Sequence, residues 1–573
     1  NNMRKDSINS DHVGKININY PSHQTYKDAK LNKETFDFRY EKLKQFIPEG
    51  STCLDIGSHI GNFTLLFASC AGKTGKVLAF EPNPHCYGPL TETVKDNPNL
   101  NIIPINVGCT EKTKKYTFNF ANDQYGFNNG GYYKESKNEA NKHLSENIHN
   151  HEIEVDGINT LDFLNKNYSK LIDKINFIKT DCEGYDHKVL QTLIPLIKKN
   201  KPVLMVEAFK FLTKEEASEL YNTIKNCGYE IYDMSPLDNI TDCVGPLNIE
   251  EFLYYNEKII DNGNILCVHE SKLEKYNLPK IVKDKKAVVI FGRNDGYKEK
   301  ERFIIHVTTM LDTFDEVIYV DWNSPKQSFL YEVMDDLPKT GRLKHFIIPP
   351  EYAEMLTNNN PKAQRCSTVL ALNIALRRTD AEWVVVSTTD IIPPFKDELD
   401  NFISKINPNS FYTLSRREVQ YKDVIDNKDQ LDKYRKKLGE TTEPRMFPAR
   451  TTPNDIWSIF NCCGDFQLAS RNLWHKIRGY EEGMLAACFS DTNAQKKATL
   501  YGFNLVPIYD IPLYHMSHEG MGNDGTNPTK QHYNNAWLWV ETFDKYIIHD
   551  HIMYSRNLDT WGFSPIDIEY ELI

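Results

Sequence analysis

The sequence predicts an α/β protein with two domains, each built on an open and mostly parallel sheet. The chain has 573 residues, which is too long for one hydrophobic core at ~150 residues per domain. In both halves, short runs rich in Val and Ile alternate with helix-like segments, a pattern typical of parallel sheets covered by helices on both faces. We place the linker in the charged stretch 269–286, which leaves a polar arm at 1–34 and domains at 35–268 and 287–573.

The composition argues against several classes of protein. The formal net charge of -11 gives no broad basic surface, so we expect no nucleic-acid partner. No stretch approaches the ~20 apolar residues of a membrane span, and the polar start does not resemble a signal peptide, so we expect no membrane span and a cytoplasmic protein. The 12 cysteines are scattered without a C-x-x-C pair, which predicts reduced thiols. The oligomeric state is left open.

Two polar segments interrupt the regular pattern. Residues 1–34 are weakly patterned and form either a flexible arm or a cap. The insert 128–150 lies between strand-like runs of the first domain. Loops at the carboxyl ends of parallel strands form the ligand crevice of such a sheet, so the insert is either a substrate lid or a solvated loop.

A glycine-containing turn follows the first strand-like run of the first domain. In "LDIGSHIGNF", Asp55 is followed by Gly57 and Gly61 and then by a helix-like segment. The pattern lacks the G-x-G-x-x-G fingerprint that binds a pyrophosphate, which favours a nucleoside ligand without one. Glu81 ends the next run, "KVLAF", where a carboxylate can bind both ribose hydroxyls. The start of the helix offers N–H groups to an anion, here a methionine carboxylate.

Acidic residues also follow a later strand-like run of the first domain. The segment "NFIKTDCEGYDHKVLQ" places Asp181 and Glu183 at the carboxyl end of the run, with His187 in the helix that follows. Together with "LDIGSHIGNF", "AFEPNP" and "VLMVEAF", this segment resembles the ordered motifs of FkbM-type S-adenosylmethionine-dependent O-methyltransferases. The resemblance covers roughly residues 35–268.

The resemblance implies methyl transfer from S-adenosylmethionine to a hydroxyl, often on a sugar, with Asp55, Gly57, Gly61 and Glu81 binding the donor. Asp181, Glu183 and His187 are then the candidates for the base or for orienting the acceptor, and Glu207 supports them from the next strand end. Structural alternatives exist for two of these residues. Glu183 can cap the following helix, and His187 can lie on its exposed face.

The second domain places acids after its strand-like runs. Arg293 and Asp295 follow the run "VVIFG", and Asp321 follows "VIYV", positions that suit recognition of a nucleotide base and ribose. The run "EWVVVSTTD" ends in Asp390. Where a metal-binding D-x-D motif is expected, the sequence has Thr388-Thr389-Asp390, with one carboxylate instead of two.

The ordered segments of residues 287–563 resemble GT-A-type glycosyltransferases, which bind a nucleotide-sugar. The resemblance implies that Asp390, with His515 or His518, holds Mn²⁺ or Mg²⁺ against the diphosphate. It also implies that Asp491 is the base if the reaction inverts the anomeric configuration. Asp465 and Gln467 then contact the donor or the acceptor.

The two resemblances together predict a bifunctional enzyme that acts on a nucleotide-sugar donor and a glycan acceptor. One domain attaches a sugar, and the other methylates a sugar hydroxyl. The alternative is a methyltransferase whose second domain has lost turnover and only binds glycans. A third interpretation, a nucleotidyltransferase, needs a glycine-rich basic loop after the first strand, and "GRNDGYKEK" is a poor version of it.

Overall fold

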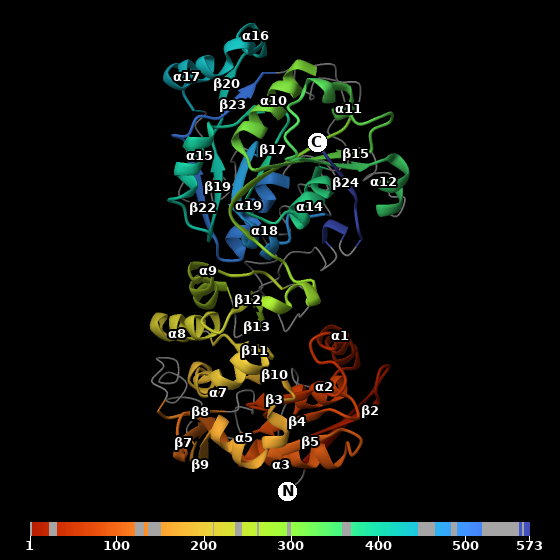
Figure 1. Ribbon diagram of the computed structural model, residues 1–573, viewed down its shortest axis with the longest axis vertical. Helices are drawn as coiled ribbons and strands as arrows, with labels where there is room; N and C mark the ends of the chain where they lie inside the picture. The colour runs from red at the N-terminus through yellow and green to blue at the C-terminus, as the bar shows by residue number, and fades with distance from the viewer. Residues whose placement is uncertain are drawn as a thin grey trace. The chain divides into compact units, whose positions relative to one another are not determined.

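The computed structural model describes most of the chain. The described residues are 3–21, 31–120, 131–135, 151–209, 211–234, 243–259, 263–294, 300–357, 368–444, 464–482, 490–517, 561–563 and 566–573. The chain divides into two compact units, residues 1–279 (unit 1) and 280–573 (unit 2). Both units combine helices with sheets, which confirms the α/β fold class (Figure 1).

A seven-stranded sheet forms the centre of unit 1. Its strands run in the order β12 (Tyr229–Asp233), β13 (Asn264–His269), β11 (Val203–Glu207), β10 (Ile175–Thr180), β3 (Thr52–Ile56), β4 (Lys76–Phe80) and β5 (Ile102–Ile105). All neighbours are parallel except at β13, which is antiparallel to β11 and β12. The chain proceeds outward from β3 through β4 to β5 and then continues on the other side of β3 at β10. The carboxyl ends of β3 and β10 therefore flank the topological switch point, where open sheets bind ligands.

Helices and a smaller sheet complete unit 1. The helices are α1 (Lys33–Leu43), α2 (Asn62–Ala71), α3 (Pro84–Lys95), α5 (Thr160–Asn167), α6 (Ser169–Ile172), α7 (Asp186–Asn200), α8 (Lys214–Lys225) and α9 (Ile249–Tyr254). Local sequence explains several helix starts, because Asn83 caps α3 just before Pro84, and Thr213 forms a capping box with Glu216 at α8. The smaller sheet has the order β6 (Gly108–Thr110), β9 (His151–Asn159), β7 (Lys114–Phe120) and β8 (Tyr132–Tyr133).

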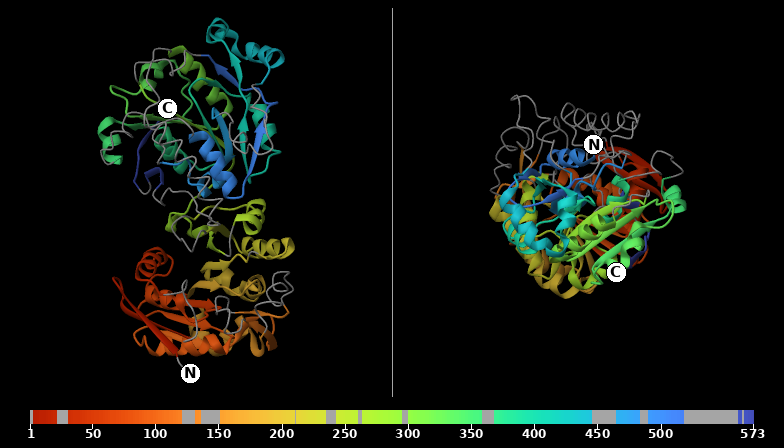
Figure 2. Two further views of the ribbon diagram at one scale, coloured as in Figure 1. Left: turned by 180° about the vertical axis from the view of Figure 1, so that it is seen from behind. Right: turned by 90° about the horizontal axis from the view of Figure 1, so that it is seen from above.

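The N-terminal segment contains an ordered hairpin. Strands β1 (Met3–Ser10) and β2 (Gly14–Pro21) pair antiparallel, and β2 packs on α3. Buried Ile16, Ile18 and Tyr20 join the core of unit 1. Figure 2 shows the hairpin, in red, along one side of its unit. Alternating apolar residues in β2 explain why this otherwise polar segment folds as a strand.

Two further segments of the sequence prediction have local structure. The boundary between the units, at Pro279 and Lys280, lies within the stretch 269–286, and Leu273 and Tyr276 pack into the core of unit 1 around two 3₁₀ turns. Strand β14 of unit 2 already begins at Val282. Within the insert 128–150, the described residues 131–135 include β8, which pairs with β7. The remainder of that insert lies outside the described residues.

An eight-stranded sheet forms the centre of unit 2. Its strands run in the order β22 (Asn504–Ile508), β19 (Ser410–Leu414), β21 (Phe466–Ser470), β17 (Ala381–Ser387), β14 (Val282–Gly292), β15 (Glu316–Trp322), β16 (Leu343–Ile348) and β24 (Tyr570–Leu572). Strand β14 is parallel to both β15 and β17. The chain moves from β14 to β15 and β16 and then returns to the other side of β14 at β17, so this sheet also has a switch point.

Helices and a small three-stranded sheet surround the main sheet of unit 2. The small sheet has the order β18 (Ile391–Ile392), β23 (Tyr514–Met516) and β20 (Arg417–Val419), and Figure 1 shows β20 beside β23. The helices are α10 (Lys300–Thr313), α11 (Phe329–Val333), α12 (Pro350–Leu356), α14 (Thr368–Arg378), α15 (Lys396–Ile403), α16 (Tyr421–Asp426), α17 (Leu431–Thr441), α18 (Arg471–Lys476) and α19 (Ser490–Leu500). None of the helices that the structure describes is long and apolar enough to cross a membrane.

The hairpin packing leads to a first prediction. Because Ile18 is fully buried, Ile18→Ala is expected to lower the free energy of unfolding of unit 1 by about 2 to 5 kcal/mol. Lys15→Ala, an exposed change on the same strand, is the matched control. All seven tryptophans lie at or after Trp322, so circular dichroism can follow both units while tryptophan fluorescence follows unit 2. Equal stability of the two variants would mean that the hairpin does not contribute to the core.

Candidate functional site

The turn after β3 brings the backbone of Gly57 against the end of β10. Gly57 has a φ of +78°, and a Cβ atom at this position would lie 1.9 Å from the carbonyl oxygen of Asp181. The N–H groups of Gly57 and Ser58 each donate to the carbonyl of Phe80 at 3.0 Å. Only glycine combines this left-handed conformation with so close an approach. The turn is therefore held between the ends of β4 and β10.

Glu81 is fixed just after β4 by two backbone groups. Its Oε2 atom accepts the N–H of His59 at 2.8 Å, and its Oε1 atom accepts the N–H of Asn83 at 2.8 Å. Burial raises the pKa of Glu81 to about 7, although the two backbone N–H groups oppose the shift. Each carboxylate oxygen retains a lone pair after these bonds, so Glu81 can accept further hydrogen bonds from a ligand.

Glu81 and Gly57 line a cavity of about 950 Å³ at the switch point of unit 1. The same cavity is also lined by the residues that follow β10, namely Asp181, Cys182 and Glu183. Further walls come from the hairpin, from α1, from α2 and from the smaller sheet, and they include Ile8, Lys33, Phe36, Arg39, Phe118 and Tyr133. The segment predicted as an arm or a cap thus forms part of the cavity wall.

Two predicted donor-binding residues have other partners in the structure. Among the described residues that line the cavity, Gly57 and Glu81 appear, whereas Asp55 and Gly61 do not. The carboxylate of Asp55 is fully buried and accepts a hydrogen bond from Thr64 Oγ1 at 2.5 Å. Gly61 caps α2 with a φ of +101°. Both residues shape the turn and the helix start instead of facing the cavity.

Lys179 is a functional candidate that the sequence analysis missed. This buried residue of β10 donates from Nζ to the carbonyl of Gly57 at 2.9 Å. The same atom lies 3.2 Å from Asp181 Oδ2 and 3.5 Å from Asp55 Oδ1. Burial alone would lower the pKa of Lys179, but Asp181 and Asp55 raise it above its ordinary value. The signal available in the sequence was a lysine within an apolar strand-like run that ends in an acid.

Three acids converge beside the cavity. One carboxylate oxygen each from Asp181, Glu183 and Glu207 lie within 4.8 Å of one another. The N–H of Glu183 also donates to Glu207 Oε2 at 3.0 Å. Burial, followed by the charge of Asp181, raises the pKa of Glu183 to about 8 and raises that of Glu207 well above its usual range. Such a cluster can take up a proton near neutral pH, and its oxygen atoms are also of the kind that Mg²⁺ or Ca²⁺ prefers.

The structure directs His187 to α8 and not to the cavity. His187 is buried on α7, and its Nε2 atom lies 3.8 Å from Glu219 Oε2 on α8. Burial lowers the pKa of His187. It is absent from the described cavity lining. The predicted role of His187 in proton transfer therefore has no geometric support, and the alternative of an exposed position is also wrong, because α8 covers this face of α7.

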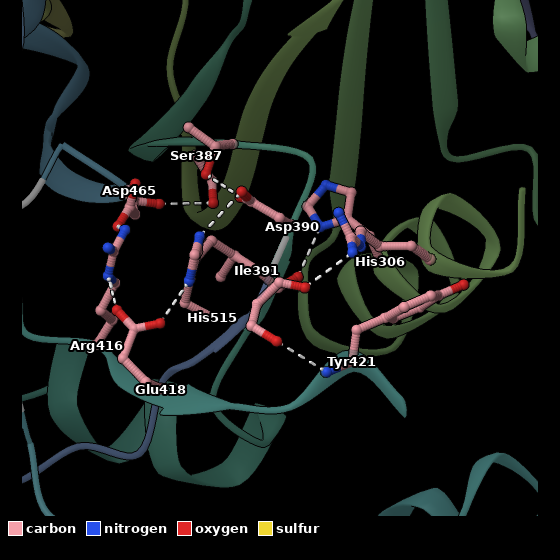
Figure 3. Close-up of polar contacts among 12 residues, drawn as sticks. His306, Ser387, Asp390, Ile391, Arg416, Glu418, Tyr421, Asp465 and His515 are labelled. Atoms are coloured by element: carbon pink, nitrogen blue, oxygen red, sulfur yellow. Dashed lines mark hydrogen bonds and ion pairs between the residues drawn. The ribbon is translucent and has the colours of Figure 1, made fainter. Parts of the chain in front are cut away.

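In unit 2, strand register brings three distant residues together. Ile391, which follows Asp390, pairs with His515 across β18 and β23. Glu418 pairs with the same histidine across β20 and β23. Figure 3 shows the imidazole of His515 between the carboxylates of Asp390 and Glu418. Residues separated by about a hundred positions in sequence thus become cross-strand neighbours.

The contacts of this cluster are specific. His515 Nε2 lies 3.0 Å from Asp390 Oδ2, and His515 Nδ1 lies 2.7 Å from Glu418 Oε2. Thr388 Oγ1 donates to Asp390 Oδ1 at 2.6 Å. Burial opposes protonation of the imidazole, but Asp390 and Glu418 raise the pKa of His515. A carboxylate oxygen and an imidazole nitrogen at this separation can serve one divalent cation of the Mn²⁺ type.

Asp491 lies near Asp465, which immediately precedes β21 of the main sheet. It lies in the first turn of α19, and a Cβ atom built on Gly464 would lie 2.6 Å from its Oδ2 atom. Burial raises the pKa of Asp491 to about 6, and the charge of Asp465 acts in the same direction. Gln467 donates from its side chain to the backbone carbonyl of Asp491 at 3.1 Å. This raised pKa suits a group that accepts a proton near neutral pH.

The other predicted nucleotide-binding residues have loop-forming roles. Buried Asp321 accepts a hydrogen bond from Ser324 Oγ at 2.8 Å, and burial raises its pKa. Arg293 donates from Nε to the carbonyl of Asn323 at 2.7 Å. These contacts hold the loop after β15 against the end of β14. Asp295 and His518 lie outside the described residues, so the choice between the two histidines rests on the observed position of His515.

Comparisons with known proteins support the first unit more directly than the second. The family model described as "Methyltransferase FkbM domain" matches residues 55–231, which confirms the sequence resemblance over that range and supports a transferase. Comparison of the chain with curated proteins found no match.

Solved structures of two kinds of transferase resemble parts of the chain. GalNAc-T7 with UDP, GalNAc and Mn²⁺ is 14% identical over 46% of this chain and 50% of its own, with a TM-score of 0.31. Mannosyltransferase PcManGT from Pyrobaculum calidifontis, in complex with GDP-Man and Mn²⁺, is 15% identical over 46% and 64%, with a TM-score of 0.28. Methyltransferase FkbM from Methylobacillus flagellatus KT is 14% identical over 44% and 48%, with a TM-score of 0.24. The chain thus spans about half to two thirds of the length of these proteins.

Gly57 provides a test of the turn. Gly57→Ala places a methyl group against the carbonyl of Asp181 in a disfavoured φ region, so it is expected to lower the stability of unit 1 and to disturb the cavity. The loss should exceed about 1 kcal/mol. Gly88→Ala on α3 is the matched control, because a Cβ there meets no atom within 4 Å. Circular dichroism during urea unfolding measures both, and equal midpoints would contradict the proposed close contact.

The buried acids lead to a prediction about pH. The pKa values of Glu183 and Asp186 are raised by burial to about 8 and about 7, above their ordinary values of 4.5 and 3.8. The folded state therefore holds these protons more tightly than the unfolded state, and stability is lost as pH rises from about 5 to 8.

Glu183→Gln keeps the side chain neutral at every pH, so the variant should lose less stability over this range than the wild type. Urea unfolding followed by circular dichroism at several pH values measures the slope. Glu215→Gln, at an exposed position on α8, is the control and should retain the wild-type slope. A wild-type slope in Glu183→Gln would show that folding does not raise the pKa of Glu183.

Proposed function

We propose that unit 1 is an O-methyltransferase that transfers the methyl group of S-adenosylmethionine to a sugar hydroxyl. The observation that carries this proposal is that Glu81 and the acids Asp181 and Glu183 line the same cavity at the switch point of the sheet. A donor-binding group and candidate bases thus face one space. The family match over residues 55–231 supports the same reaction class.

The residues of the cavity fit this donor. Glu81 has a free lone pair on each oxygen for the two ribose hydroxyls, because each oxygen accepts only one backbone N–H. Asn62 and Phe63, in the first turn of α2, line the cavity, and no side chain caps this helix among the described residues. Such a helix start favours a carboxylate. The bound donor supplies an activated methyl group.

The acids of unit 1 have two roles toward the acceptor, which are proton removal and orientation. Lys179 Nζ lies 3.2 Å from Asp181 Oδ2, so a cation faces this carboxylate. We assign Asp181 as the group that removes the hydroxyl proton. Glu183 and Glu207, with their raised pKa values, hold protons near neutral pH and can orient the acceptor through hydrogen bonds.

Donor binding and methyl transfer can be tested separately in the full chain. Glu81→Ala is expected to weaken S-adenosylmethionine binding, measured by calorimetry, by about 1 to 3 kcal/mol. Asp181→Asn should bind the donor normally and slow methyl transfer ~100- to 10,000-fold, as expected for a lost base. Asp162→Asn, at an exposed position on α5, is the control. If the folded wild-type protein gives no binding heat, the assignment of S-adenosylmethionine as the donor is wrong. If Asp181→Asn keeps full activity, the assignment of Asp181 as the base is wrong.

For unit 2, we propose transfer of a sugar from a nucleotide-sugar donor to a glycan acceptor with the help of Mn²⁺ or Mg²⁺. The observation that carries this proposal is the convergence of Asp390 and His515 at the switch point. A divalent cation bound there neutralises diphosphate charge. Asp491, with its raised pKa and its position near Asp465, is the proposed base. We keep a cytoplasmic location as part of the proposal.

The second activity predicts coupling between cation and nucleotide. Uridine or guanosine diphosphate should bind more tightly with Mn²⁺ than without it, and the nucleotide should strengthen Mn²⁺ binding by the same factor. Asp390→Asn should remove this coupling and the sugar transfer but leave methyl transfer intact. Asp397→Asn, exposed on α15, is the control.

Two other outcomes of this titration correspond to rival functions. Nucleotide binding that ignores Mn²⁺ and survives Asp390→Asn indicates a transferase without a metal. A wild-type protein that binds glycans but no nucleotide indicates that unit 2 is a glycan-binding module, which was the alternative from the sequence.

A further inference from the structure

The contacts of Glu418 point to a role that the sequence analysis did not assign. We propose that Glu418 is a positioning residue that holds the imidazole of His515 by accepting its Nδ1 proton, so that Nε2 is directed to the place where Asp390 also binds the cation. The inference rests on the cation site proposed for unit 2. It concerns which residue makes the histidine a ligand, not which residues bind the ion.

The direction of the hydrogen bond follows from simple chemistry. A carboxylate is only an acceptor, so the contact of 2.7 Å between Glu418 Oε2 and His515 Nδ1 requires the proton to be on Nδ1. By the same rule, the contact of 3.0 Å between Nε2 and Asp390 Oδ2 places a proton on Nε2 in the metal-free protein. A cation bound by Asp390 would take the place of that proton, and the Nδ1 proton would remain with Glu418. Histidines that bind metals commonly donate their second N–H to a carboxylate in this way.

The strand register makes the contact a built feature of the fold. Glu418 and His515 are paired residues of the parallel strands β20 and β23, so their side chains leave the small sheet on the same face. His515 is 8% exposed, which limits the rotation of its ring. The backbone around the site is also tied, because the N–H of Met516 donates to the carbonyl of Asp390 at 2.9 Å.

Arg416 holds Glu418 in place. Glu418 is 48% exposed, so its side chain could rotate freely without a second contact. Arg416 donates from Nε to Glu418 Oε1 at 2.7 Å, and its guanidinium also pairs with Asp465 (Figure 3). Glu418 Oε1 therefore accepts a hydrogen bond from Arg416, and Oε2 accepts one from His515. Asp465 is tied to the end of β17 in turn, because its carbonyl accepts Ser387 Oγ at 2.7 Å.

An ordinary surface ion pair does not account for this arrangement. Exposed ion pairs typically contribute little to stability. If Glu418 formed only such a pair, its replacement should not change how His515 Nε2 binds a cation. The single imidazole instead contacts one carboxylate through each ring nitrogen, and one of these carboxylates, that of Asp390, lies between β17 and β18 at the switch point. Loss of such a supporting carboxylate typically weakens metal binding ~10- to 100-fold.

Mn²⁺ titration of the full chain tests the proposal. Glu418→Ala should weaken Mn²⁺ binding ~10- to 100-fold, measured by calorimetry or by the electron paramagnetic resonance signal of free Mn²⁺. Glu418→Gln, which keeps an acceptor oxygen, should recover part of the affinity. Glu440→Ala, at an exposed position on α17, removes a carboxylate from the same unit and should bind Mn²⁺ like the wild type. Unchanged affinity in Glu418→Ala would overturn the proposal.

A second measurement separates this proposal from the proposed function. NMR of the metal-free protein with ¹⁵N-labelled histidine reports the Nδ1 proton of His515, assigned by its absence in His515→Gln. In the wild type, this proton should exchange slowly with water because Glu418 accepts it, and in Glu418→Ala it should exchange rapidly. If the wild type shows this protected proton but binds no Mn²⁺, the cation function falls and Glu418 still positions the ring. If the exchange rate is the same in both proteins, Glu418 does not position it.

Discussion

The approach of the Gly57 turn to the end of β10 is the constraint on which the organisation of unit 1 depends. The carbonyl of Asp181 occupies the space that a side chain at position 57 would need. Lys179 then reaches the carbonyl of Gly57 and the carboxylates on both sides, so one buried cation ties two adjacent strand ends together. The cavity walls and the acid cluster are positioned relative to this junction.

The clustering of Glu183, Asp186 and Glu207 near one lysine has an energetic cost that the fold meets by protonation. Burial raises the pKa of all three carboxyl groups. Lys179 pairs with Asp181 beside these acids. A site that holds protons next to such an ion pair is suited to general acid–base chemistry.

Unit 2 positions its polar side chains by a different physical route. Its polar cluster depends on the register of three short strands, which brings Asp390, Glu418 and His515 together. Arg416 and Asp465 extend the cluster by alternating charges, so each side chain is held by a neighbour of opposite sign. Strand pairing therefore supplies the precision that a tight turn supplies in unit 1.

The sequence by itself determined the α/β class, the glycine turn, Glu81 and the acids after β10, because these features depend on local pattern and on the rule that strand ends share one edge. Tertiary structure alone decided that Asp55 faces Thr64 and Lys179, that His187 is covered by α8, and that the hairpin forms a wall of the cavity. It also decided that Glu418 meets His515, because strand register depends on the packing of segments about a hundred residues apart, which no local pattern encodes.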